Sequence, residues 1–302
     1  MKHILFLATG GTLSCRQSEN GLSPALTGEQ LLQYLPEIAD FCTVTVENPY
    51  SVDSTDMTTA HRIQLAEQIY TQYANYDGFI ISHGTDTLSY TTALLYHMLR
   101  NLDKPVLLTG AQKPIGVLQS DAERNLLDTF RVAVSGYFGV AAVVHGQIIR
   151  GNHLVKVDCE DMNPFRSINA SLDGTVNADG TLTLLPQTPP MEPFALVPVT
   201  NTSIFVLKLI PDLDVNLFSM LSRFQHVILE GYGSGGIPVD LEDALKQLIE
   251  QGTRVYITTQ CLSGTVDLTK YTVGCRAQKL GAISLGSHTL EDAIAAIQCG
   301  EL

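Results

Sequence analysis

Two short apolar runs, each followed directly by a turn that contains glycine and threonine, constrain the fold of this chain more than any other feature. The first run is 4–8 (ILFLA), followed by 9–12 (TGGT), and the second is 78–82 (GFIIS), followed by 83–87 (HGTDT). Short apolar runs that end at glycine are typical of buried strands in a parallel sheet. The sequence therefore predicts a parallel α/β core.

Helical periodicity lies between further strand-like runs. Apolar residues recur every three or four positions from Thr58, from Asp86 and from Leu241. The strand-like runs are 41–46, 78–81, 106–109, 140–144, 204–209, 227–229 and 255–258. Alternation of strands and helices favours a parallel sheet with helices on both faces.

The alternation stops between Gly146 and Leu185, where Asp173-Gly174 and Asp179-Gly180 predict hairpin turns. A proline-rich stretch, 186–198, follows and suits an extended linker. We therefore expect a larger amino-terminal domain at 1–188, a linker at 189–200 and a smaller α/β domain at 201–302.

Composition argues against several classes of partner. The net charge is −13, from 31 acidic and 18 basic residues, and no run of lysine or arginine occurs, so neither nucleic acid nor a membrane surface is an expected partner. The six cysteines show no C-x-x-C spacing and are expected to be reduced thiols in the cytoplasm. The first apolar stretch is too short for a signal peptide or a membrane span. No cluster of histidine, cysteine and aspartate has metal-ligand spacing, so neither a metal nor a cofactor is expected.

The two threonine-bearing turns are the candidate reactive centre. Strand ends of an open α/β sheet meet at one crevice, so Thr12 and Thr85 are expected there together, with Asp86 beside them. A threonine hydroxyl needs a nearby base to become a nucleophile, and the Gly10-Gly11 pair lets backbone N–H groups approach an oxyanion. The alternative is purely structural, with Thr12 capping a tight turn and Asp86 capping the next helix.

These motifs resemble the two signatures of bacterial-type L-asparaginases. The similarity extends in order along the chain, through 54–57 (STDM), 109–112 (TGAQ) and 149–152 (IRGN), the last followed by Lys156. The segment 259–264 (TQCLSG) is similar to the cytoplasmic, type I branch of the family.

The resemblance implies hydrolysis of L-asparagine, with a possible minor glutaminase activity, by a cytoplasmic homodimer or dimer of dimers that uses no cofactor. Thr12 would be the nucleophile, and Thr85, Asp86 and Lys156 would form a second catalytic group in which neutral Lys156 moves a proton through Thr85. Substrate binding would involve the residues Gly11, Ser54, Thr55, Gly84, Thr85, Asp86 and Ala111. Ser54 and Thr55 would hold the α-carboxylate, Asp86 the α-ammonium, and the Ala111 carbonyl the side-chain amide.

The chain departs from the family at two positions. The loop after the nucleophile usually carries a tyrosine beside a glycine, whereas here Gly21 is followed by Leu22. We expect the segment Leu13 to Thr27 to be a flexible lid in which acylation is slow without the tyrosine. The alternative is that another hydroxyl, with Ser23 the nearest candidate in sequence, takes its place. Glu230 stands where the type I branch often has an arginine in an effector site, which puts substrate-driven allostery in doubt.

Three other functions remain open from the sequence. The segment 231–236 (GYGSGG) fits the G-x-G-x-x-G spacing of dinucleotide-binding proteins, but Pro238 interrupts the expected helix, Asp240 is the better candidate for its cap, and no acid ends the following strand. The chain could instead be a catalytically silent amino-acid sensor that lost the loop tyrosine. A third possibility is the amidase component of a tRNA-dependent amidotransferase, which shares these motifs but normally has an extra amino-terminal domain.

Overall fold

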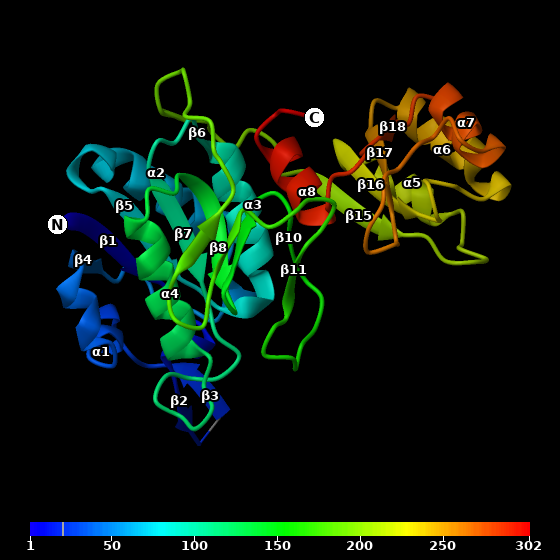
Figure 1. Ribbon diagram of the computed structural model, residues 1–302. Coiled ribbons are helices and arrows are strands. Elements are labelled where there is room, and N and C mark those ends of the chain that lie inside the picture. Colours follow the sequence, from blue (N-terminus) through cyan, green and yellow to red (C-terminus); the bar gives the residue numbers. More distant parts are fainter. Residues whose placement is uncertain (20) are drawn as a thin grey trace. The chain divides into compact units, whose positions relative to one another are not determined.

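The computed structural model describes residues 1–19 and 21–302, and Asn20, which belongs to the expected lid, lies outside the described residues. The chain divides into two units, Met1–Pro198 and Val199–Leu302, both drawn in Figure 1. Each unit has its own sheet and its own buried apolar clusters. The expected α/β class is confirmed.

Unit 1 is built on an eight-stranded sheet in the order β13-β12-β9-β8-β7-β5-β1-β4. Its parallel strands are β1 (Lys2–Ala8), β4 (Cys42–Glu47), β5 (Gly78–Ser82), β7 (Pro105–Thr109) and β8 (Gly139–Val144). The antiparallel strands β9 (Gln147–Arg150), β12 (Gly174–Val176) and β13 (Leu182–Leu184) extend one side. The interval without helical alternation is thus an antiparallel continuation of the same sheet.

Helices cover both faces of the parallel part of this sheet. Figure 1 shows α4 (Ala122–Val134) in front of the strands, with α2 (Thr59–Gln72) and α3 (Leu88–Met98) behind them. On the α4 face, Phe6 and Phe130 meet edge to face with ring centroids 5.8 Å apart. Both side chains are fully buried, and each such burial contributes roughly 1.5–3 kcal/mol. Alternate residues of β1 are buried against opposite layers because successive side chains of a strand point to opposite faces.

Shorter elements complete unit 1. They are η1 (Thr12–Ser14), β2 (Cys15–Ser18), β3 (Gly21–Pro24), α1 (Gly28–Leu32), η2 (Pro36–Asp40), η3 (Ser54–Asp56), η4 (Tyr73–Asn75), η5 (Thr85–Thr87), β6 (Leu99–Arg100), β10 (Leu154–Lys156), β11 (Phe165–Ser167) and β14 (Ala195–Leu196). The expected lid contains an antiparallel hairpin of β2 and β3, in which Leu22 is paired with Gln17.

Unit 2 has a four-stranded parallel sheet in the order β15-β16-β17-β18. Its elements are β15 (Ile204–Lys208), α5 (Leu217–Leu221), β16 (His226–Gly231), η6 (Val239–Leu241), α6 (Glu242–Glu250), β17 (Arg254–Thr259), α7 (Thr272–Lys279), β18 (Ile283–Ser284) and α8 (Leu290–Gln298). The buried cluster on one face of the sheet draws on α5, α6 and α7, and α8 packs over Ile228 and Tyr256 on the other face.

Two local predictions from the sequence are wrong. Asp173-Gly174 makes no hairpin turn: Gly174 opens β12, and the Asp173 carboxylate is buried in an ion pair with Arg150. Asp179-Gly180 does lie in the turn between β12 and β13. Asp240 caps no helix, because it lies inside η6, whose N-cap is Pro238.

The glycine-rich segment of unit 2 does not lead into a helix as a dinucleotide-binding loop does. Tyr232 and Gly236 close it by two backbone hydrogen bonds, of 3.0 and 2.8 Å, and α6 begins only at Glu242. Within the described part of the chain, no helix combines the length and apolar character needed to cross a bilayer.

The turn after β5 is supported by a fully buried histidine, His83. Arg62 Nε donates to Thr91 Oγ1 (2.9 Å), and Thr91 Oγ1 lies 2.8 Å from His83 Nε2. The Nδ1 of His83 donates to the Gly84 carbonyl at 2.7 Å. Burial lowers the pKa of His83 to about 4; the Gly84 bond opposes this shift and the charge of Arg62 adds to it. His83 is therefore a neutral structural support for the turn at physiological pH.

We predict that protonation of His83 contributes to acid destabilisation. Between about pH 6.5 and 4, this histidine is protonated in the unfolded chain but stays neutral in the folded protein. The free energy of unfolding therefore decreases as the pH is lowered, by up to ~3 kcal/mol at pH 4. Urea unfolding of the wild type and of His83→Gln, followed by circular dichroism at several pH values, gives the free energy of unfolding of each. We expect this free energy to depend less steeply on pH in the variant. A folded His83 ring that titrates near pH 6.5 by NMR contradicts the prediction.

Candidate active site

Three turns meet through glycine backbones at the carboxyl edge of the unit 1 sheet. Gly11 has a φ of 76°, and a Cβ there would lie 2.3 Å from the backbone nitrogen of Gly84. A Cβ on Gly84 would in turn lie 2.6 Å from Ser54 Oγ. Only glycine permits approaches this close, because any side chain would collide. The turns that carry Thr12, Thr85 and Ser54 are thereby held against one another.

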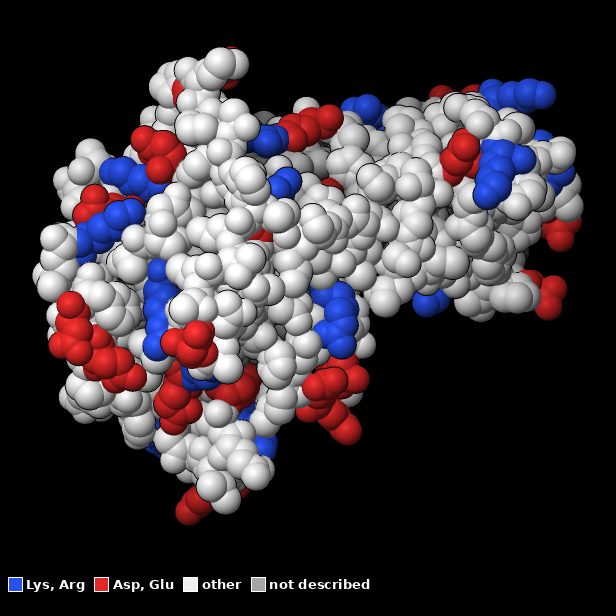
Figure 2. Space-filling model, viewed as in Figure 1, with Lys and Arg blue, Asp and Glu red and all other residues white. Residues whose placement is uncertain are grey.

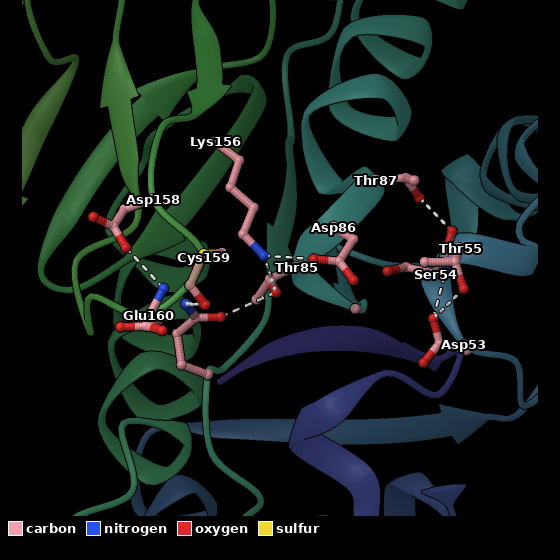
Figure 3. A network of polar contacts seen from close by, with 12 residues as sticks. Asp53, Ser54, Thr55, Thr85, Asp86, Thr87, Lys156, Asp158, Cys159 and Glu160 are labelled. Carbon is pink, nitrogen blue, oxygen red and sulfur yellow. Dashed lines mark hydrogen bonds and ion pairs between the residues drawn. The ribbon is translucent and has the colours of Figure 1, made fainter. Parts of the chain in front are cut away.

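Lys156 contacts both Thr85 and Asp86, from a strand about 70 residues further along the chain (Figure 3). Its Nζ lies 2.9 Å from Thr85 Oγ1 and 2.6 Å from Asp86 Oδ1. The Lys156 side chain is only 15% exposed, whereas that of Asp86 is 57% exposed. An amine, a hydroxyl and a carboxylate are therefore in direct contact, with the carboxylate open to solvent.

Asp86 is not the helix cap that a purely structural interpretation requires. The N-cap residues of η5 and α3 are Gly84 and Thr87, and neither makes a side-chain capping bond. In Figure 3 the Asp86 carboxylate lies between Lys156 and the Ser54–Thr55 pair. Its Oδ2 has no hydrogen-bond partner within 1–19 and 21–302. One oxygen of Asp86 thus holds Lys156, and the other is available to a ligand.

Thr12 begins η1 directly after the Gly10-Gly11 turn and is partly exposed. Its hydroxyl makes no hydrogen bond to the part of the protein that the structure describes. Leu22, on the adjoining hairpin, is 53% exposed. Thr12 therefore presents a hydroxyl without an internal partner next to the turn that carries Thr85.

The segment 53–55 is fixed by an aspartate that the sequence analysis did not single out. Asp53 Oδ1 accepts from the Thr55 backbone N–H (2.9 Å) and from Thr55 Oγ1 (2.8 Å). Thr87 Oγ1 donates to the carbonyl of buried Ser54 at 2.7 Å, which ties this segment to the turn after β5. The signal was present, because an aspartate two residues before a threonine commonly forms such a turn.

Gln112 is the second functional candidate that the sequence analysis missed. Its Nε2 donates to the carbonyls of Cys159 (3.2 Å) and Asp161 (3.1 Å), which can only accept. The amide orientation is therefore fixed, and Oε1 must accept the hydrogen of Thr85 Oγ1, 3.2 Å away. Thr85 consequently donates to Gln112 while it accepts from Lys156.

The turn after β7 is anchored from α4. Asp121 accepts from the backbone N–H groups of Gln112 and Lys113 at 3.0–3.1 Å, and Asn125 Nδ2 donates to the Gly110 carbonyl at 2.9 Å. Ala111, between them, is buried. Gly110 packs close to the Thr85 methyl group, since a Cβ on Gly110 would lie 3.3 Å from it. The contacts from α4 therefore fix the Ala111 backbone next to Thr85.

The face shown in Figure 2 has no extended patch of lysine and arginine side chains. On the face shown in Figure 2, lysine and arginine side chains lie singly or in small groups among acidic ones. Among the described residues, no three histidine, cysteine, aspartate or glutamate side chains form a group that could hold a metal ion. The site as built offers hydroxyl, amine and carboxylate groups, which suit acyl transfer.

Comparison with known proteins agrees with this chemistry. Family models described as "Asparaginase, N-terminal" and "Glutaminase/Asparaginase C-terminal domain" match residues 3–188 and 203–300. The solved structure of the thermostable L-asparaginase from Thermococcus kodakarensis is similar to this one, with a TM-score of 0.92 and 31% identity, over 98% of this chain and 92% of that chain.

Two relatives show the range of the family. L-asparaginase 1 of Escherichia coli is 33% identical, over 96% of this chain and 89% of its own length. A component of the glutamyl-tRNA(Gln) amidotransferase of Pyrococcus furiosus is 34% identical, over 93% of this chain and 67% of its own length. The resemblance seen in the motifs is confirmed: the chain belongs to the asparaginase family of amidohydrolases.

Proposed function

We propose that the protein hydrolyses L-asparagine to L-aspartate and ammonia through an acyl-enzyme on Thr12. The observation that carries the proposal is the contact of Lys156 with Thr85 and Asp86, beside the turn that presents Thr12. The resemblance to type I enzymes adds a cytoplasmic location and an assembly of close dimers to the proposal.

The reaction has two acyl-transfer steps. Thr12 Oγ1 gives up its proton and attacks the side-chain amide carbon, the C–N bond breaks, and the nitrogen leaves as ammonia with the proton that Thr12 gave up. Water then attacks the Thr12 ester and restores the free hydroxyl as aspartate departs. The Thr12 backbone N–H stabilises the oxyanion of each tetrahedral intermediate, since the Gly11 N–H already donates to the Val52 carbonyl at 3.2 Å.

Thr85 and Lys156 move protons in this scheme. In the structure Lys156 donates to Thr85 and to Asp86, an arrangement that suits its ammonium form. To take a proton through Thr85, Lys156 must first become neutral, and the Thr85 hydroxyl must turn its hydrogen from Gln112 toward Nζ. The resting site therefore becomes the working site through two changes, the loss of a proton from Lys156 and a rotation of the Thr85 hydroxyl.

Asp86, Ser54, Thr55 and Ala111 bind the substrate. The free oxygen of Asp86 accepts from the α-ammonium, and the neighbouring Ser54–Thr55 segment receives the α-carboxylate. The Ala111 carbonyl accepts from the amide nitrogen of the side chain. The α-ammonium thus meets a carboxylate and the amide nitrogen meets a carbonyl. The Thr55 hydroxyl, which donates to Asp53 in the structure, must turn from Asp53 to donate to the α-carboxylate.

The match to a glutamyl-tRNA(Gln) amidotransferase component supports a second candidate, an amidase that supplies ammonia for tRNA-dependent amidation. A silent amino-acid sensor is the third, since Leu22 replaces the expected tyrosine. Ammonia release from free L-asparagine without tRNA favours the first candidate. Release only in the presence of tRNA favours the second, and binding without turnover favours the third.

We predict that Thr12→Ala and Thr85→Ala each lower kcat for L-asparagine by ~10²–10⁴-fold or more, because each removes a reacting or proton-transfer group. Ammonia release measures kcat, and circular dichroism checks the fold. Thr12→Ser is the matched control and retains more activity than Thr12→Ala because it keeps a hydroxyl. A variant that is folded and keeps about a tenth of wild-type kcat shows that its threonine has been assigned wrongly.

We predict that Lys156→Arg is as inactive as Lys156→Met, with kcat lowered by ~10²-fold or more. Arginine can preserve the ion pair with Asp86 but stays charged and accepts no proton. Lys246→Met is the control, because Lys246 is exposed on α6 and lies 3.8 Å from Glu250. Substantial activity in Lys156→Arg means that lysine contributes charge alone.

We predict that Gln112→Met lowers kcat by roughly 10–100-fold with little change in KM, because misplacing a catalytic group by about 1 Å has effects of this size. Gln112→Glu is also impaired, since a carboxylate accepts from Thr85 but cannot donate to two carbonyls. Gln247→Met, at an exposed position of α6, is the control. If the wild type and these three variants have the same kcat, Gln112 does not help to position Thr85.

A further inference from the structure

A cavity of about 380 Å³ lies in unit 1 at the amino ends of β7 and β8, at the sheet edge opposite Thr12 and Thr85. Its walls are the end of α3 with β6, the residues that lead into β8, and the proline-rich segment 186–190. Arg150 and Asp173 also line it. The cavity volume is within the usual range for sites that take small molecules.

The proline-rich segment is fixed in place as a wall of this cavity. The Gln187 side chain accepts from the Phe138 backbone N–H (3.1 Å) and donates to the Phe138 carbonyl (2.9 Å). Further on, Ala195 and Leu196 pair with β6, and Asn101 Nδ2 donates to the Pro193 carbonyl at 3.2 Å. A segment that served only as a flexible linker would need none of these contacts, so the cavity is preformed.

Arg150 is held rigidly in this cavity. Its Nε and Nη2 lie 3.2 and 2.7 Å from the two oxygens of Asp173, which also accepts from the Tyr137 hydroxyl at 2.8 Å. Asp173 and Tyr137 are almost fully buried, and burial together with the Asp173 charge raises the pKa of Tyr137, so its hydroxyl stays protonated and donates. The carboxylate is therefore satisfied from within the protein.

The outer edge of the Arg150 guanidinium is available to a ligand. Its Nη1 makes no hydrogen bond to any residue that the structure describes, and the side chain is 46% exposed. Arg100 also lines the cavity, with its guanidinium 6.0 Å from the Tyr96 ring centre. The charged side chains that line the cavity are therefore two guanidinium groups and one carboxylate.

We propose that this cavity binds a small molecule that carries a carboxylate on an apolar body. A fixed guanidinium edge matches the planar geometry of a carboxylate, and Tyr96, Phe138 and Pro186 offer apolar surface beside it. The site is separate from the reaction at the opposite edge and does not depend on the proposed function.

The test measures binding of benzoate and of benzamide, its uncharged analogue, to the full chain by calorimetry or NMR titration. Benzoate is expected to bind at least tenfold more tightly than benzamide, with weaker binding at high salt. No benzoate binding, equal affinity for the two probes, or binding of inorganic phosphate but not of benzoate each overturns the proposal.

Two variants locate the bound probe. Arg150→Lys keeps a cation next to Asp173 but removes the planar edge, and Thr188→Trp fills the cavity mouth without touching the ion pair. Both are expected to weaken benzoate binding at least tenfold while leaving ammonia release from asparagine unchanged; Lys246→Gln, in unit 2, leaves both unchanged. Benzoate affinity that is unaltered in folded Thr188→Trp shows that the probe binds elsewhere and overturns the proposal.

Discussion

The contact of the Gly11 and Gly84 backbones is the constraint on which the site depends. It brings the ends of β1 and β5 closer than strand pairing alone requires, since a Cβ on Gly11 would lie 2.3 Å from the Gly84 nitrogen. Thr12 follows one of these glycines and Thr85 the other. The spacing of the two hydroxyls is thus set by backbone atoms, which vary less in position than side chains do.

Thr85 links Gln112 to Lys156, because its hydroxyl makes a hydrogen bond to each of them. A hydroxyl has one hydrogen, and in the structure that hydrogen is directed at Gln112 while Lys156 donates to the oxygen. The carbonyls of Cys159 and Asp161 hold the Gln112 amide in one orientation. Gln112 Oε1 is therefore the acceptor in its hydrogen bond with Thr85. The protonation of Lys156 and the orientation of Thr85 are consequently coupled.

The sequence predicted the features that are local to strand ends. Apolar runs that end in glycine located β1 and β5 and the turns after them, because burial and backbone freedom are both visible in residue type. It could not predict Gln112 as a partner of Thr85, since the bonds that orient its amide come from residues 47 and 49 positions away. The prediction of a hairpin turn at Asp173-Gly174 was wrong for a similar reason. The pair has the composition of a turn, but the contacts of buried Asp173 with Arg150 and Tyr137 determine its conformation.

The hydrogen bonds from Gln112 Nε2 to the segment after β10 are accepted by main-chain carbonyls alone, those of Cys159 and Asp161. Any amino acid at position 159 supplies the same acceptor, whereas Asp161 also uses its side chain, which accepts from the Asn163 backbone N–H at 2.9 Å. Segment length is a further constraint, because one inserted residue between Lys156 and Asp161 would move both acceptors out of register with the amide. At position 159, selection would act on spacing rather than on residue identity.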